Sequence, residues 1–149
     1  MNRPLVFYPL LLLLFFLGIS ASFGGWILMA SPEVFGMQHG WLDKSLVKSF
    51  FPFGLILFVF NGLFPLFAAV GLLLKPDWRW VNALNIYRDR HWGWTYSLFS
   101  GIIIMVWITV QITVVPNTWL QPAYLAVGLL ILIFTLWPSM MRYCQFREK

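Results

Sequence analysis

Residues 50–74 read FFPFGLILFVFNGLFPLFAAVGLLL, and this stretch decides the fold because no charged side chain interrupts its 25 residues. An α-helix needs about 20 mostly apolar residues to cross a hydrocarbon core of roughly 30 Å. The stretch is long enough for that crossing. It therefore predicts a helix that spans a membrane.

Three further apolar stretches accompany it, over residues 5–29, 92–115 and 119–141. Hydrophobic residues make up 60% of the chain and charged residues only 10%, whereas a soluble domain has about 25% charged residues. Four spans and their short connections use nearly all of the 149 residues. The sequence therefore predicts a single transmembrane domain over residues 1–149, an all-α integral membrane four-helix bundle.

The two longer loops predict the orientation of this bundle. The loop over residues 31–49 holds two cations, Lys44 and Lys48, whereas the loop over residues 75–91 holds four. Cytoplasmic loops have an excess of Lys and Arg, so the second loop is predicted to be cytoplasmic and the first to be the outer loop. Both termini are then cytoplasmic and the helices run up-down-up-down. The cations predicted on the cytoplasmic side are Arg3, Lys75, Arg79, Arg88, Arg90, Arg142, Arg147 and Lys149.

The cationic loop is also a candidate site for lipid headgroups, through Lys75, Arg79, Arg88 and Arg90. Each Lys or Arg close to an anionic leaflet contributes about 1 kcal/mol of attraction. The alternative is that these cations only set the topology, and the two interpretations are compatible. The net charge of +5 is explained by cations at the ends of apolar stretches, so we expect membrane lipids as partners and no nucleic acid.

Two local signals refine the predicted helices and loops. Pro65 lacks the amide that would bond the carbonyl of Asn61, so a kink is expected there. The outer loop is expected to contain a short interfacial helix. Its apolar face would comprise Trp41, Leu42, Leu46 and Val47.

Small residues stand four apart in the first predicted helix, Ser20 with Gly24 and Ala21 with Gly25. Such spacing lets two helix backbones approach closely. The pattern fits packing inside the bundle and also a homodimer face. We favour internal packing.

Groups that carry chemistry are scarce inside the predicted spans. None of the spans has an Asp, Glu, Lys, Arg or His at its centre, and such residues usually mark ion paths or proton relays. His39 and His91 are predicted on opposite membrane faces, where they cannot share one metal or haem. Cys144 is the only cysteine, which excludes an intramolecular disulfide. We expect no catalytic residue, no metal site and no cofactor.

Neutral polar residues are the remaining candidates for a site. Asn61 and Gln111 should face the bundle, because an unpaired amide in hydrocarbon costs several kcal/mol. Trp107 and Gln111 are four residues apart and share one helical face. If Asn61 faces them, Asn61, Trp107 and Gln111 would bind the polar end of an otherwise apolar ligand. The alternative, which we favour here, is that the amides bond across helices and are structural.

Several short motifs occur in an order that resembles small bacterial four-helix inner-membrane proteins. The motifs are Gly24-Gly25, Pro52-Phe53-Gly54-Leu55, Asn61-Gly62 followed by Pro65-Leu66, the segment from Trp107 to Gln111, and Trp119-Leu120-Gln121-Pro122.

This resemblance implies a bundle in the bacterial inner membrane, and it transfers no catalytic residue because the group has no established activity. These proteins have an acid or an amide at the position of Gln111, and the amide found here argues against a proton-coupled role. A looser similarity to the DoxX-like group rests on size and helix count alone.

Three functions are consistent with these observations. The first is a non-enzymatic membrane protein that binds a lipid or hydrophobic small molecule, or that serves as an accessory subunit. Its expected protein partner is a second copy of the chain, as a homo-oligomer, or another membrane protein. The second is a transporter or channel component. The third is an interfacial lipid- or quinone-linked enzyme that uses Glu33, His39 and Asp43 of the outer loop. The first is favoured, because the spans lack catalytic groups.

Overall fold

The computed structural model describes residues 2–43 and 46–146, with the side chain of His39 left out, and it is all-helical. Helices account for 74% of the chain and no strand is found in the described ranges, which confirms that the protein is all-α as predicted. The helices and helical turns are α1 (Phe7–Ala30), η1 (Pro32–Phe35), η2 (His39–Leu42), α2 (Phe51–Ile56), η3 (Leu57–Leu63), α3 (Phe64–Leu74), α4 (Arg79–Asn82), α5 (Trp92–Val114), α6 (Leu120–Thr135) and α7 (Pro138–Cys144).

Three helices are long and apolar enough to cross a membrane. They are α1 with 24 residues, the continuous run Phe51–Leu74 with 24 residues, and α5 with 23 residues. The pair α6 and α7 is a fourth span only if the two are taken together, because they meet at an angle of 63°. These lengths support a membrane location for the protein.

The prediction of one continuous fourth helix over residues 119–141 is therefore wrong. α6 ends at Thr135, and Trp137 has an extended backbone with ψ of 133° before α7 begins at Pro138. The proline ring disfavours the α conformation at the preceding residue, and here Trp137 is extended and the chain turns. The apolar composition continues across the break, so the hydropathy of the sequence does not indicate where the helix ends.

The second span is irregular just before Pro65. Residues Leu57–Leu63 form a π-helical segment in which the amide of Phe64 bonds the carbonyl of Val59, five residues earlier. The helix then continues through Pro65 to Leu74. The sequence predicts the irregularity at Pro65 as a kink, whereas the structure has a wider turn directly before it.

Pairs of glycines let neighbouring helices approach closely. A Cβ atom added to Gly25 of α1 would lie 2.7 Å from the carbonyl oxygen of Gly54 in α2, and one added to Gly101 of α5 would lie 3.0 Å from that of Gly128 in α6. These distances leave no room for a side chain. The predicted internal packing of the first helix is thus confirmed at Gly25, while Gly24 faces a more open space.

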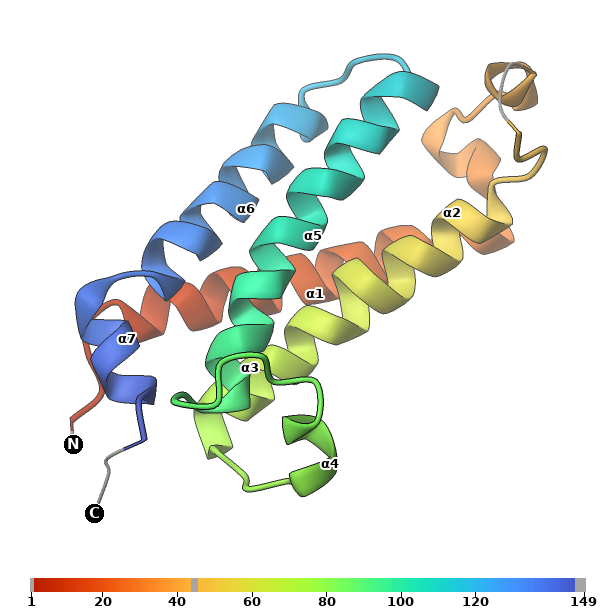
Figure 1. Ribbon diagram of the computed structural model, residues 1–149. Helices are drawn as coiled ribbons and strands as arrows, with labels where there is room; N and C mark the ends of the chain where they lie inside the picture. Colours follow the sequence, from red (N-terminus) through yellow and green to blue (C-terminus); the bar gives the residue numbers. More distant parts are fainter. Residues whose placement is uncertain (1, 44–45, 147–149) are drawn as a thin grey trace.

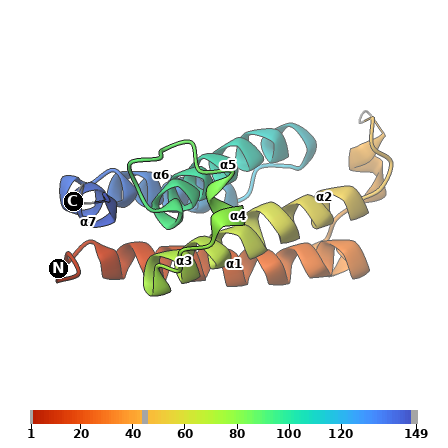
Figure 2. The same ribbon diagram turned by 60° about the horizontal axis from the view of Figure 1, so that its bottom comes forward.

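The helices form two antiparallel pairs stacked as two layers. α1 lies along the run α2–η3–α3 in one layer, and α5 lies along α6 in the other (Figures 1 and 2). The layers meet closely where α3 contacts α5, since a Cβ atom on Gly93 would lie 2.8 Å from the backbone of Gly71.

Hydrogen bonds from backbone amides and from the Arg3 side chain hold both ends of the described chain near the loop over residues 75–91. The amide of His91 donates to Cys144 (2.9 Å), and that of Phe146 donates to Asp89 (2.9 Å). Near the other end of the chain, Arg3 donates to the carbonyl of Leu73 (3.4 Å). The cations Arg3, Lys75, Arg79, Arg88 and Arg90 therefore lie at one end of the bundle, while Lys44, Arg147 and Lys149 lie outside the described residues.

The outer loop lies at the opposite end and holds two short 3₁₀ turns, η1 and η2. Leu42 is buried against Leu28 and Phe50. Leu46, which is predicted on the same apolar face, is fully exposed. The predicted apolar face is therefore wrong: Leu42 is the last residue of η2, and neither Leu46 nor Val47 is helical, while residues 44–45 lie outside the described ranges.

Candidate ligand-binding cavity

A cavity of about 480 Å³ lies between the two helix layers at the end that carries the outer loop. Its walls come from α1, α2, η3, α5 and α6, and Phe35, Met37 and Trp41 of the outer loop line it as well. The volume falls within the roughly 300–1,000 Å³ typical of small-molecule sites. The cavity is therefore the natural candidate for a functional site.

The cavity follows from how the two layers pack. Glycines hold each helix pair together, and the contact of Gly71 with Gly93 holds the layers together near the loop over residues 75–91. Toward the outer loop, larger side chains face each other across the layers, such as Phe53 and Trp107, whose ring centroids are 6.3 Å apart. The space between them is left open.

Two candidate residues from the sequence lie on the wall that α5 contributes. Trp107 and Gln111 both line the cavity, one helical turn apart. Trp107 is only 9% exposed. Neither its indole N–H nor the Gln111 amide has a hydrogen-bond partner within residues 2–43 and 46–146. Neither group is among the fully buried atoms that lack a partner in this part of the chain, so both are accessible to a ligand in the cavity.

Two other polar side chains around the cavity, Ser20 and Gln121, are already paired with the protein. The hydroxyl of Ser20 donates to the carbonyl of Phe16 (2.7 Å). The side-chain oxygen of Gln121 accepts from the amide of Thr118 (3.2 Å), and its nitrogen donates to the carbonyl of Pro116 (3.5 Å). Besides Trp107 and Gln111, the indole of Trp41 and the hydroxyl of Tyr124 line the cavity without a hydrogen-bond partner in the described part of the chain.

The structure places Asn61 elsewhere. Its side chain is 1% exposed and does not line the cavity, and neither its oxygen nor its nitrogen has a partner in the described part of the chain. The hydroxyl of Ser22 on the adjacent face of α1 is likewise buried and unpaired. The arrangement brings Trp107 and Gln111 together but does not add Asn61 to their site.

Sequence reasoning missed the residues that α6 and the loop before it give to the cavity, including Gln121 and Tyr124. Gln121 stands next to Pro122 in the first turn of an apolar helix. Polar residues are common at the ends of such helices, so the sequence alone does not mark Gln121 as a binding residue. The outer-loop residues were also missed. Only the relative placement of the two layers brings these segments together.

The four candidate headgroup residues divide into two pairs. Lys75 donates to the carbonyl of Tyr143 (2.9 Å) and lies 3.4 Å from the centroid of its ring. Arg90 pairs with Asp89 (3.2 Å) and lies over the ring of Trp94 at 4.4 Å. Arg79 and Arg88 are exposed, so these two are the cations that remain accessible to headgroups.

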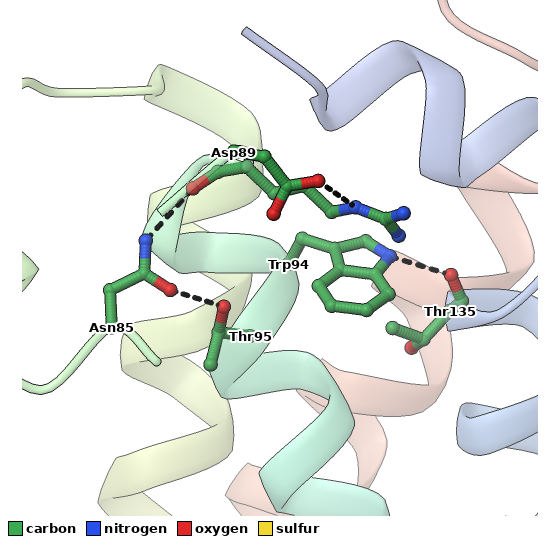
Figure 3. A network of polar contacts seen from close by, with 6 residues as sticks. Asn85, Asp89, Trp94, Thr95 and Thr135 are labelled. Atoms are coloured by element: carbon green, nitrogen blue, oxygen red, sulfur yellow. Dashed lines mark hydrogen bonds and ion pairs between the residues drawn. The ribbon is translucent and has the colours of Figure 1, made fainter. Parts of the chain in front are cut away.

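A polar network fastens the same loop to the beginning of α5 (Figure 3). The amide nitrogen of Asn85 donates to the carbonyl of Arg90 (2.8 Å), and the hydroxyl of Thr95 donates to the side-chain oxygen of Asn85. Beside them, the indole N–H of Trp94 donates to the carbonyl of Thr135 (2.7 Å). These groups satisfy one another, which indicates a structural role.

His91 caps α5 in a neutral form. Its Nδ1 accepts from the amide of Gly93 (3.1 Å), so Nε2 carries the proton and donates to the carbonyl of Pro76 (3.2 Å). Burial lowers the pKa of the imidazole below its ordinary value of 6.5. Both nitrogens are thus engaged, and the described residues contain no cluster of His, Cys, Asp or Glu suited to a metal ion.

Comparison of the chain with protein-family models, with curated proteins and with solved structures gave no match.

Proposed function

We propose that the protein is a non-enzymatic membrane protein that binds one hydrophobic small molecule or lipid chain in the cavity between its helix layers. The observation that carries the proposal is the cavity itself, with its volume of about 480 Å³ and its mostly apolar wall. Membrane-embedded apolar molecules reach such a space without first being desolvated from water.

The composition of the wall supports binding rather than chemistry. The described lining residues include no Asp, Glu, Lys, Arg or His, which are the side chains that usually act in proton transfer and ion conduction. Aliphatic and aromatic side chains cover most of the surface, and Trp107 and Gln111 add hydrogen-bonding groups. This is the usual composition of a site for a hydrophobic ligand.

The proposed setting is the bacterial inner membrane, with an up-down-up-down path and both termini in the cytoplasm. The accumulation of Lys and Arg at the end that holds the loop over residues 75–91 favours this orientation. The cavity would then open in the outer half of the bilayer, and Arg79 and Arg88 would meet anionic headgroups of the inner leaflet. Alkaline phosphatase fused to the C-terminus would be inactive in this orientation.

Native mass spectrometry of the protein, extracted gently from its own membrane, tests the proposal. We expect one discrete mass beyond that of the polypeptide and detergent. Gly24→Phe should remove this mass, because Gly24 lines the cavity and has space beside it. A Cβ atom at this position would have its nearest neighbour, on Leu57, 3.7 Å away. Ala126→Phe, at an exposed position of α6 outside the cavity, is the matched control.

A bare polypeptide mass, with Gly24→Phe indistinguishable from the wild type in every ligand titration, would overturn the proposal. The same spectrum reports a second copy of the chain or another membrane protein, and a complex of this kind without a small molecule would favour the accessory-subunit role.

A further inference from the structure

We infer that the cavity selects an uncharged ligand that presents a hydrogen-bond acceptor, such as the carbonyl of an ester, an amide or a quinone, to Trp107 and Gln111. This inference rests on the proposed function and names the chemical class of the ligand. It follows from which groups around the cavity are paired and which are not.

The indole of Trp107 sets the first requirement. It is nine-tenths buried, it lines the cavity, and its N–H has no partner among the residues that the structure describes. An indole N–H can donate but cannot accept. The complementary group on a ligand must therefore be an acceptor.

Gln111 strengthens the requirement. It lies one turn along α5 from Trp107 on the same wall, so both side chains reach the same part of the cavity. Its amide nitrogen offers a second donor, and its oxygen can accept from a ligand hydroxyl. The polar groups of Ser20 and Gln121 are engaged by the protein. The hydroxyl of Tyr124 and the indole N–H of Trp41 also line the cavity without a partner among the described residues, and both can donate to the same kind of acceptor.

The walls on both sides of this turn are apolar. Ala21, Leu57 and Ile104 lie on the side toward the middle of the helices, and Leu28 and Val114 lie toward the outer loop. The hydrocarbon part of a ligand would contact these side chains. An ionised headgroup held between them would lose its hydration without an opposite charge, at a high free-energy cost.

Three probes that share a hydrocarbon chain separate these requirements. Methyl palmitate is neutral and has an acceptor, hexadecane is neutral without one, and palmitate at pH 8 is charged. Native mass spectrometry of the delipidated protein in detergent would measure the bound fraction of each against concentration. We expect methyl palmitate to bind about tenfold more tightly than either of the other two, which corresponds to one net hydrogen bond.

Trp107→Phe should reduce the affinity for methyl palmitate about tenfold and leave that for hexadecane within about twofold. Trp119→Phe is the matched control, because Trp119 is 76% exposed and lies outside the cavity lining. If Trp107→Phe does not fold, Gln111→Leu provides the same comparison at the partly exposed neighbour.

The outcomes distinguish the inference from the proposed function. Equal binding of ester and hexadecane, or tighter binding of palmitate, overturns the inference and leaves the cavity as a binding site. Absence of binding for all three probes, together with a bare native protein, overturns the proposed function itself.

Discussion

The indole N–H of Trp94, in the first turn of α5, donates to the backbone carbonyl of Thr135, the last residue of α6, over 2.7 Å. The bond joins the two helices of one layer directly before the chain turns into α7. Trp94→Phe removes the donor and leaves a buried carbonyl without it, so we expect a loss of about 1–3 kcal/mol in the free energy of unfolding. Denaturant unfolding in detergent, followed by circular dichroism, measures the loss.

Trp119→Phe is the control for this measurement because Trp119 is largely exposed. An equal change in both variants would show that the bond to Thr135 contributes nothing specific.

Two buried asparagines should respond in opposite ways to substitution. Asn61 is buried with both amide atoms unpaired in the described part of the chain, whereas Asn85 bonds Arg90 and Thr95. Asn61→Leu should leave stability unchanged or raise it, because an unpaired polar group is removed from the interior. Asn85→Leu should cost about 1–3 kcal/mol, because it leaves two partners unpaired.

The midpoint of thermal unfolding of the two variants in one detergent checks this contrast. A large loss for Asn61→Leu would mean that its amide has a partner, such as a buried water, that matters to the fold.

The neighbouring residues Gly24 and Gly25 of α1 should differ in how well they tolerate a side chain. A Cβ atom on Gly25 would lie 2.6 Å from the amide nitrogen of Phe58, whereas one on Gly24 would have its nearest atom, on Leu57, at 3.7 Å. Gly25→Ala should therefore separate α1 from the second span and lower the yield of folded protein severalfold, and Gly24→Ala should be tolerated. Size-exclusion chromatography after detergent extraction reports the folded fraction, and equal yields would contradict the close contact.

The cap of α5 predicts a dependence of stability on pH. Burial lowers the pKa of the His91 imidazole below 6.5, so the unfolded chain binds a proton at His91 more readily than the folded one. Stability is then complete above about pH 6.5 and falls as the pH drops from there through the folded pKa. His91→Asn keeps an N-cap acceptor and should flatten this part of the profile.

Unfolding temperatures measured between about pH 5 and 7.5, where His titrates, check the effect. The same loss of stability in His91→Asn would assign the titration to another group.

The helices could be predicted from the sequence because a membrane span needs only a long apolar run, which is a local property. A proline marks a possible break, because it disfavours the α conformation at the residue before it. The rule does not decide which proline breaks the helix, since Phe64 before Pro65 stays in the α conformation whereas Trp137 before Pro138 does not. The break before Pro138 was missed because hydropathy alone continues across Trp137.

The candidate site could be predicted only in part. Trp107 and Gln111 share a wall because four residues make about one turn of a regular helix. Asn61 lies in the π-helical segment, where the hydrogen bonds reach five residues back and each wide turn rotates the following residues away from their expected face. The cavity depends on how two helix layers diverge, and no local pattern encodes that angle.

The bend between α6 and α7 limits how far this flank of the protein reaches across a bilayer. The 16 residues of α6 rise about 24 Å, and α7, turned by 63°, adds less than half of its own length along that axis. Lipids beside the other spans meet hydrophobic walls long enough for a core of roughly 30 Å. α6 alone falls short of this thickness, and the seven residues of α7 extend it by about 5 Å along the same axis. The two helices together are therefore just long enough to form one broken span, and α6 depends on α7 to complete it.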